Sequence, residues 1–332
     1  MNTAFARRVG SAKELPITVM TIAIFVVSAI FASGSVSGAA LTTMLPLAGV
    51  LMIASTGQSL VIQQRGIDLS GAAMLSFGAV IASVYCHGEA GKLAVAIVIA
   101  VVAGLVVGAI NGAMVLIGLV PIVATLAMYE LLQGVIQSYA NGTSQSVPAA
   151  LARFSIGKFL GIPNVLYVSV IVVIVVALIM EATRAGHRFV ATGVNIRASI
   201  AAGTRTRQQV LAAYALCSAA YAVSGVLLAG YVTTPSQNIG DTYLLAPIAI
   251  VILAGNSFGA AKISIIATAL GALFYTQLGQ FTLSLGAPSS SQFYIQSIGI
   301  MALPVARWIL LALVRQRSRR PLPVITSAGN PA

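Results

Sequence analysis

The chain has 332 residues, of which 58% are hydrophobic and only 7% are charged, and its formal net charge is +12. Soluble domains carry about 25% charged residues, so this composition excludes a soluble protein and indicates a polytopic membrane protein built as one bundle. The basic residues are scattered over connecting segments with little aromatic interleaving, so membrane topology explains them better than nucleic acid as a partner.

Apolar segments follow one another along the chain. A bilayer core of about 30 Å needs about 20 apolar residues per helix. Measured against that length, the sequence predicts an all-α membrane protein with about ten transmembrane helices. The predicted spans are residues 17–33, 42–62, 69–86, 93–117, 122–140, 165–182, 209–231, 243–256, 262–284 and 293–313. The eighth is short for a perpendicular crossing, and a partly re-entrant segment is the alternative.

The first span follows Arg7, Arg8 and Lys13, a pattern that also resembles a cleavable signal peptide. Its apolar run, residues 17–32, is slightly long for a signal peptide, and many spans follow it. A retained first helix is therefore favoured.

The distribution of Lys and Arg predicts the orientation. With the N-terminus inside and alternating spans, the outside segments hold only Lys92, Arg153 and Lys158, and Arg307 lies near the end of the last span. All other Lys and Arg fall inside, which predicts that both termini are cytoplasmic. The predicted parts are a cytoplasmic tail at 1–16, a transmembrane domain at 17–313, with a cytoplasmic loop at about 183–208, and a basic cytoplasmic tail at 314–332.

Two polar outside loops, residues 141–164 and 233–242, are rich in turn-forming residues. They are interpreted either as surfaces for an external protein or as ordinary connections.

The segment RGIDLSG at 65–71 separates the second and third spans. Asp68 and Ser70 are predicted to cap the third span by accepting hydrogen bonds from its free backbone N–H groups. Gly66 and Gly71 permit a tight break, and a gating role for Gly66, Asp68 and Ser70 is compatible with capping.

Gly104, Gly108 and Gly112 recur every four residues and so share one helical face. Small residues at this spacing let two helices approach closely, and we expect a packing role rather than a direct role in a solute path.

Polar side chains inside spans are rare because each unsatisfied group in hydrocarbon costs several kcal/mol. Amides and hydroxyls both donate and accept hydrogen bonds, which suits a polyol or a sugar, although bonds between helices are the simpler explanation for many of them. Glu130 is the one carboxylate well inside a span, and it shares a face with Gln133 and Gln137. The candidates for a solute path are Gln58, Asn111, Thr125, Glu130, Gln133 and Gln277.

Signals of catalysis are missing from the sequence. It has no HExxH, no GxSxG and no carboxylate pair at helical spacing, and the Gly–Lys pairs at 91–92 and 157–158 lack the Ser or Thr of a phosphate loop. Cys86 and Cys217 have no CxxC partner and are interpreted as packing residues. We predict no catalytic residue, metal site or cofactor on this chain, so transport driven by ATP would need a separate subunit.

Basic residues gather between the sixth and seventh spans. Five arginines and His187 lie within Thr183–Arg207, without any Asp or Glu. Because the charge distribution places this loop in the cytoplasm, we predict that it docks a partner protein. Arg184 and Arg188, next to the sixth span, are interpreted mainly as anchors facing lipid headgroups.

The motif RGIDLSG resembles the GGIDLSVG signature of the inner-membrane permease subunits of bacterial sugar ABC importers, of the ribose, galactose, xylose and autoinducer-2 type. The similarity spans about residues 45 to 313 in the same order. It continues through NG at 111–112, VPIVATLAM at 120–128, GVNIRA at 193–198, IA at 248–249 and AGNS at 254–257.

This resemblance implies the ABC importer permease fold, in the bacterial inner membrane. It implies a second permease subunit, identical or different, a cytoplasmic ABC ATPase that binds ATP and Mg, and a periplasmic solute-binding protein. It also implies that the loop holds a short coupling helix that enters a cleft on the ATPase, with Gly203 as its stop. The residues assigned to this coupling loop are Asn195, Arg197, Ala198, Gly203, Arg205 and Arg207.

Departures from the family pattern concern the substrate and the partner subunit. The first glycine of the signature is Arg65, and the family's Gly-x-x-Tyr-Glu-Leu reads GDTYLL at 240–245, without the Glu. Such departures are compatible with a different solute and with one half of a heterodimer.

The function predicted is that of a permease subunit for a monosaccharide, polyol or similar hydroxylated solute. One alternative is a permease for branched-chain amino acids, which would need to bind zwitterions. A second is a secondary transporter driven by protons, with Glu130 as the relay. A membrane-embedded enzyme is disfavoured because no catalytic constellation is found.

Overall fold

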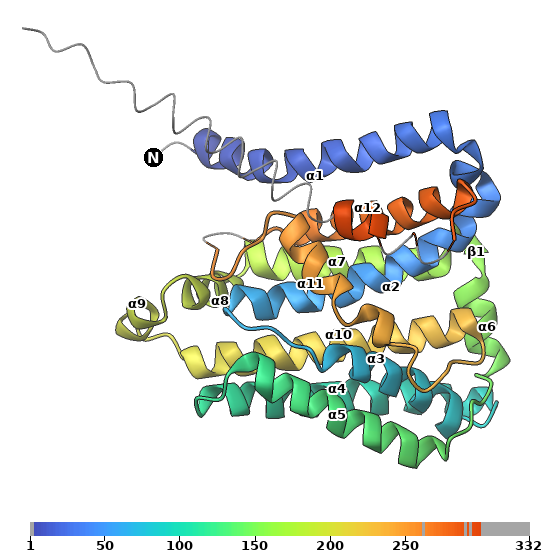
Figure 1. The fold of residues 1–332 in the computed structure, drawn as a ribbon. Coiled ribbons are helices and arrows are strands. Elements are labelled where there is room, and N and C mark those ends of the chain that lie inside the picture. The colour runs from blue at the N-terminus through green and yellow to red at the C-terminus, as the bar shows by residue number, and fades with distance from the viewer. Residues whose placement is uncertain (1–2, 261–262, 289–290, 292–293, 300–332) are drawn as a thin grey trace, which may run out of the picture.

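The structure is a computed structural model that describes residues 3–260, 263–288, 291 and 294–299. Its long helices run nearly parallel or antiparallel to one another in a single bundle (Figure 1). The elements are α1 (Thr3–Phe31), η1 (Ser33–Val36), α2 (Gly38–Gln63), α3 (Gly71–Val80), η2 (Ile81–Tyr85), η3 (Ala90–Lys92), α4 (Leu93–Leu116), α5 (Pro121–Ala140), α6 (Ala149–Ile156), β1 (Lys158–Phe159), β2 (Ile162–Pro163), α7 (Asn164–Ala182), α8 (Arg184–Val194), α9 (Ile196–Ala201), α10 (Thr206–Val232), η4 (Asp241–Tyr243), α11 (Ala246–Leu253) and α12 (Ile265–Ser284).

Five of the described helical segments are long and apolar enough to cross a membrane. They are Glu14–Phe31, Gly38–Gln63, Ala90–Leu116, Asn164–Ala182 and Thr206–Val232. The chain is therefore an α-helical multi-pass membrane protein.

Each of the first nine predicted spans overlaps one helix, in order α1, α2, α3, α4, α5, α7, α10, α11 and α12, but α3, α5, α11 and α12 are not among the five segments above. The tenth, at 293–313, falls outside the described residues except for 294–299, and so does the tail predicted at 314–332. Two helix boundaries and one loop differ from expectation. Helix α1 begins at Thr3 and runs through Pro16, where a tail was predicted. The loop at 141–164 contains α6 and a short antiparallel pair, β1 with β2. Helix α11 has only 8 residues.

Helix α10 lies at the centre of the bundle and packs against α2, α3, α4 and α6 (Figure 1). Its Tyr214 and Tyr221 are fully buried, as is Cys217 between them. Small residues allow the neighbouring backbones to come close. A Cβ atom at Gly225 would collide with the carbonyl of Leu75 on α3, so α3 and α10 approach at backbone distance there.

Helix α3 is short because the chain between α2 and α3 runs back into the bundle before the helix begins (Figure 1). Residues 66–68 have no regular secondary structure, and the helix continues after Val80 through a π-helical turn, η2. Irregular backbone at this depth is tolerated in a membrane protein only where protein or water satisfies its polar groups. The partners of these groups define the first candidate site.

Candidate functional site

A buried group of polar side chains surrounds the start of α3, and we call it the Asp68 cluster. Its members are Gln58 of α2, Asp68 and Ser70 before α3, Asn111 of α4, Thr125 of α5 and Ser218 of α10, each at most 1% exposed. Three predicted path candidates, Gln58, Asn111 and Thr125, are thereby brought together with two members of the 65–71 motif.

The Asp68 carboxylate is held by neutral donors from three directions. One oxygen accepts from the Ser70 hydroxyl at 2.6 Å and the Ser70 backbone N–H at 2.9 Å. The other oxygen accepts from the Ser218 hydroxyl at 3.1 Å. The Asn111 amide donates to the Ser70 oxygen at 2.7 Å and lies 3.5 Å from the Asp68 carboxylate. A buried carboxylate needs such donors, so the cluster fixes α3 against α4 and α10.

The backbone around Asp68 is bonded as well. The Gln58 carboxamide satisfies both of its polar atoms when its nitrogen donates to the Asp68 carbonyl at 3.1 Å and its oxygen accepts from the Asp68 N–H at 3.2 Å. The Thr125 hydroxyl oxygen accepts from the Leu69 N–H at 3.1 Å. Gly66 leaves room for the Tyr214 hydroxyl, because a Cβ atom there would collide with it.

The prediction that Ser70 caps α3 with its side chain is wrong. Ser70 is the N-cap residue, but its side chain makes no capping hydrogen bond and donates to Asp68 instead. The Asp68 carboxylate accepts from the Ser70 N–H at this helix start.

A second polar group lies on an exposed face formed by α5 and η4, and we call it the Asp241 group. The Asp241 carboxylate accepts from the Tyr129 hydroxyl at 2.8 Å and from the Gln133 amide at 3.1 Å. The Gln133 amide also donates to the Tyr129 oxygen at 3.0 Å. The side chain of Glu130 is exposed on the same helix. Gln133 thus joins a group, whereas no bond of Glu130 is seen in the described part of the chain.

Sequence reasoning missed Tyr129 and Asp241. Asp241 was the one acid in the polar loop before the eighth span, which is the signal that could have marked it. Its position is fixed by its neighbour Gly240, whose N–H donates to the Ser76 hydroxyl on α3 at 2.8 Å. A side chain at Gly240 would collide with the Ala72 carbonyl, so η4 lies directly on α3.

Gln277 belongs to neither group. Its amide donates to Ser28 of α1 at 3.0 Å and lies 3.5 Å from the Ser35 hydroxyl of η1. Gln277 is fully buried, and these contacts join α12 to the first helix. Gln277 therefore forms hydrogen bonds between helices, and it does not lie beside the other candidates for the solute path.

The glycines of α4 all face α10. A Cβ atom at Gly104, Gly108 or Gly112 would lie against the backbone near Ala219, Tyr214 and Leu211, respectively. Helix α4 thus approaches α10 closely along three turns.

The basic loop forms two short helices, and the second projects beyond the end of the bundle (Figure 1). The Thr183 hydroxyl caps α8 by accepting from the Gly186 N–H at 3.0 Å, and Asn195 caps α9 by accepting from the Ala198 N–H at 3.0 Å. After α9, the N–H of Gly203 donates to Ile200 at 2.9 Å and the N–H of Thr204 donates to Ser199 at 2.9 Å. This is the Schellman ending, and Gly203 has the positive φ of 74° that it requires.

The surface of α9 is apolar and basic at the same time. Ile196 is 47% exposed and Ile200 is 59% exposed, and the neighbouring Arg197 and Ala198 are exposed too. Arg205 and Arg207 are exposed just beyond the helix. Exposed isoleucines on a projecting, polar tip are typical of a protein-binding surface.

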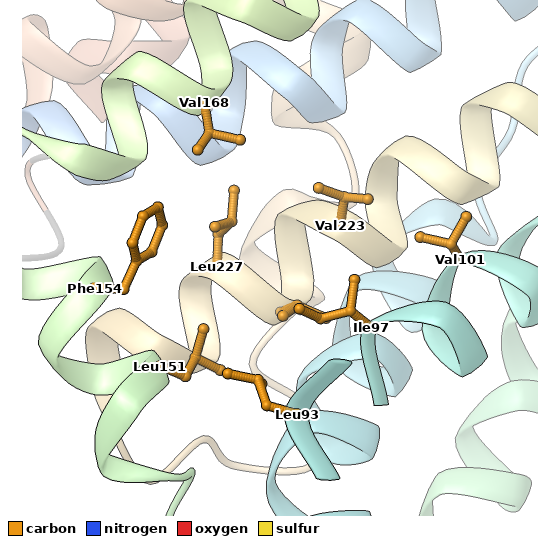
Figure 2. Close-up of a pocket in the computed structure, with 9 residues that line it drawn as sticks. Leu93, Ile97, Val101, Leu151, Phe154, Val168, Val223 and Leu227 are labelled. Carbon is orange, nitrogen blue, oxygen red and sulfur yellow. The ribbon is translucent and has the colours of Figure 1, made fainter. Parts of the chain in front are cut away.

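A cavity of about 410 Å³ opens between α4, α6, α7 and α10 (Figure 2). Its lining is wholly apolar, and Figure 2 shows Leu93, Phe154 and Leu227 pointing into it. It offers no hydrogen-bond partner to a hydroxylated solute, so it does not share the chemistry of the two polar groups. In the described residues there is also no group of three or more His, Cys, Asp or Glu that could hold a metal ion.

Residues 40–303 match the family model described as "Branched-chain amino acid transport system / permease component". The chain is 30% identical over 268 residues to the ribose import permease protein of Escherichia coli (strain K12), which covers 79% of this chain and 83% of the relative. It is 30% identical to the fructose import permease protein of Bifidobacterium longum, over 76% of this chain and 73% of the relative. It is 28% identical to the autoinducer 2 import system permease protein of Shigella flexneri, over 93% and 90% of the two chains. No solved structure matches the chain.

Proposed function

Because the chain belongs to the family of permease components of the branched-chain amino acid transport system type, we propose that it forms the membrane path of an ABC importer. The proposed solute is a sugar, a polyol or a similar small hydroxylated molecule. The names of the relatives support this choice over a branched-chain amino acid, since they refer to the import of ribose, fructose and autoinducer 2.

The observation that carries the proposal is the exposed Asp241 group on α5 and η4. Polar side chains on the lipid face of a membrane helix are costly, so such a face lines a water-filled path or meets another subunit. Tyr129 and Gln133 present a hydroxyl and an amide, which suit the hydroxyl groups of a sugar. We assign this face to the solute path, between this chain and a second permease subunit.

The proposed topology has ten spans with both termini in the cytoplasm of a bacterium, in the inner membrane. The transmembrane domain is 17–313, and the basic loop at about 183–208 is cytoplasmic. Two observations support this: the distribution of Lys and Arg along the sequence, and the contact of Arg65 with the end of α8, which brings two segments assigned to the inside together at one end of the bundle.

We assign ATP binding to a separate ATPase subunit, which would hold ATP and Mg, and delivery of the solute to a periplasmic binding protein. Helix α9 is the proposed coupling helix. Its exposed isoleucines would enter an apolar cleft on the ATPase, and Arg197, Arg205 and Arg207 would meet an acidic rim. The Asp68 cluster would hold α3 in place beside the path.

Uptake of labelled sugars tests the proposal. The chain is reconstituted in proteoliposomes with its ATPase and its solute-binding protein, and ribose, fructose and leucine are offered with and without ATP. We expect sugar uptake that requires ATP and that leucine does not inhibit. Uptake that persists without ATP and collapses with an uncoupler would instead show a proton-driven transporter, and leucine uptake that sugars do not inhibit would show an amino acid permease.

A further inference from the structure

Three consecutive side chains at the end of α2 hold the last turns of α8, and we call them the clasp: Gln63, Gln64 and Arg65. All their contacts are to backbone carbonyls. The Gln64 amide donates to Phe189 at 2.8 Å, and the Arg65 guanidinium donates to Gly193 at 2.8 Å and to Val194 at 2.5 Å. The Gln63 amide donates to Val190 of α8 at 3.3 Å and also to Ala260, in the segment before α12, at 2.9 Å.

The two carbonyls that Arg65 binds are the last two of α8. Carbonyls at a helix end have no partner within the helix, so outside donors decide how firmly that end is held. The next residue, Asn195, is the cap of α9. Arg65 therefore fixes the backbone at the junction from which α9 projects.

The site is shaped to receive this side chain. A Cβ atom at Gly193 would collide with the Gln63 carbonyl, and one at Gly259 would collide with the Arg65 side chain. Arg65 itself has a φ of +65°, in the left-handed region that favours glycine. The motif that this segment resembles has glycine at the position of Arg65, and glycine supplies no side-chain donor. The arginine thus occupies an unfavourable backbone conformation and makes two bonds that glycine cannot make.

Only two residues separate Arg65 from Asp68, and both are packed so that the backbone between them has little room to move. Gly66 is packed against Tyr214 of α10, and Ile67 lies beside Thr125, whose hydroxyl oxygen is 3.4 Å from its carbonyl. The segment ends in the Asp68 cluster, bonded to α2, α4 and α10. A short segment held at both ends transmits displacement instead of absorbing it.

We propose that Arg65 is a coupling residue, which links the junction of α8 and α9 to the Asp68 cluster, so that a movement of α9 shifts the start of α3. This rests on the proposed function, because α9 moves only if an ATPase binds it. A basic residue that served merely as a topology anchor would point its charge to lipid headgroups, whereas the Arg65 guanidinium donates to two backbone carbonyls.

Two substitutions separate these roles. Arg65→Gly removes both bonds and relieves the backbone strain, and Arg65→Lys keeps the positive charge but loses the planar pair of donors. Lys92→Arg, on η3 beside α6 at the other end of the bundle, is the control, because it keeps a half-exposed positive charge next to Glu89. In the complete transporter in proteoliposomes, we expect both Arg65 variants to lower the solute imported per ATP hydrolysed by about fivefold or more, the lower end of typical coupling between sites. The control should equal the wild type.

A second measurement needs neither solute nor ATP. Hydrogen exchange is followed at the amides of residues 195–203 in the full-length permease, in nanodiscs. We expect Ser218→Ala, which removes a donor to Asp68, to speed exchange at these amides when Arg65 is present and to have no effect there in the Arg65→Gly background. A wild type that imports nothing with ATP would reject the proposed function. If the wild type imports normally, two results would each overturn the coupling role. One is unchanged import per ATP in both Arg65 variants, and the other is an equal effect of Ser218→Ala on hydrogen exchange in both backgrounds.

Discussion

Gly108→Ala tests how closely α4 approaches α10. A Cβ atom at this position would collide with the Tyr214 carbonyl oxygen and lie 2.6 Å from the Ala215 Cα atom. Since carbon atoms pack at about 3.5–4.0 Å, the two helices would have to separate by about 1 Å. Separation would loosen the contacts of Gly104 and Gly112 on the same face.

Overpacking of this kind costs about 1–3 kcal/mol. Alanine has a better helix propensity than glycine by about 1 kcal/mol, which offsets part of that cost. The control is Gly134→Ala on α5, where a Cβ atom would meet nothing within 4 Å and only the gain in propensity applies. The expected net effect is destabilisation for Gly108→Ala and none for Gly134→Ala.

The assay is thermal unfolding of both purified variants in detergent, followed by the loss of the monodisperse peak in size-exclusion chromatography. Gly108→Ala should lower the midpoint, and Gly134→Ala should leave it unchanged or raise it. If Gly108→Ala were as stable as the wild type and fully active in transport, the backbone contact between α4 and α10 would not exist as described.

Three further perturbations address the other assigned residues. Replacing Arg197 and Ala198 together with glutamate should separate ATP hydrolysis from solute uptake without preventing membrane insertion; normal uptake would contradict the docking of α9. Asp241→Asn weakens charge-assisted hydrogen bonds worth about 1.5–3 kcal/mol, so the midpoint of thermal unfolding should fall and uptake per folded protein should fall by about tenfold or more; unchanged uptake would contradict the assignment of this face to the solute path. Gln277→Leu removes the bond to Ser28 and should cost about 0.6–1.7 kcal/mol of stability, with uptake per folded protein unchanged; a selective loss of uptake would return Gln277 to the solute path.

Local patterns in the sequence predicted the helices well, because the cost of burying polar backbone in lipid imposes a length and a composition on each span. The four-residue spacing of Gly104, Gly108 and Gly112 defined one face of α4, although it did not indicate which helix would lie against it. That partner, α10, follows almost a hundred residues later in the chain.

Contacts between distant segments were not predictable in the same way. Gln58, Asn111 and Thr125 were selected as polar residues inside spans, but only the fold shows that Asp68 gathers them. Tyr129 and Asp241 are far apart in the sequence, and no local pattern pairs them. Arg65 was recognised as a departure from a family motif, and its bonds to the end of α8 depend on a helix more than a hundred residues away.

The burial of both cysteines has a practical consequence. Cys86 and Cys217 are free thiols with no exposed surface, so the described part of the wild-type chain offers no thiol to a water-soluble maleimide. The sulfur of Cys217 lies 3.6 Å from the Gln58 carboxamide, in contact with the Asp68 cluster. Labelling of Cys217 during turnover would therefore report directly that water has entered the centre of the bundle. Because Cys217 is a native residue, the experiment needs no introduced cysteine.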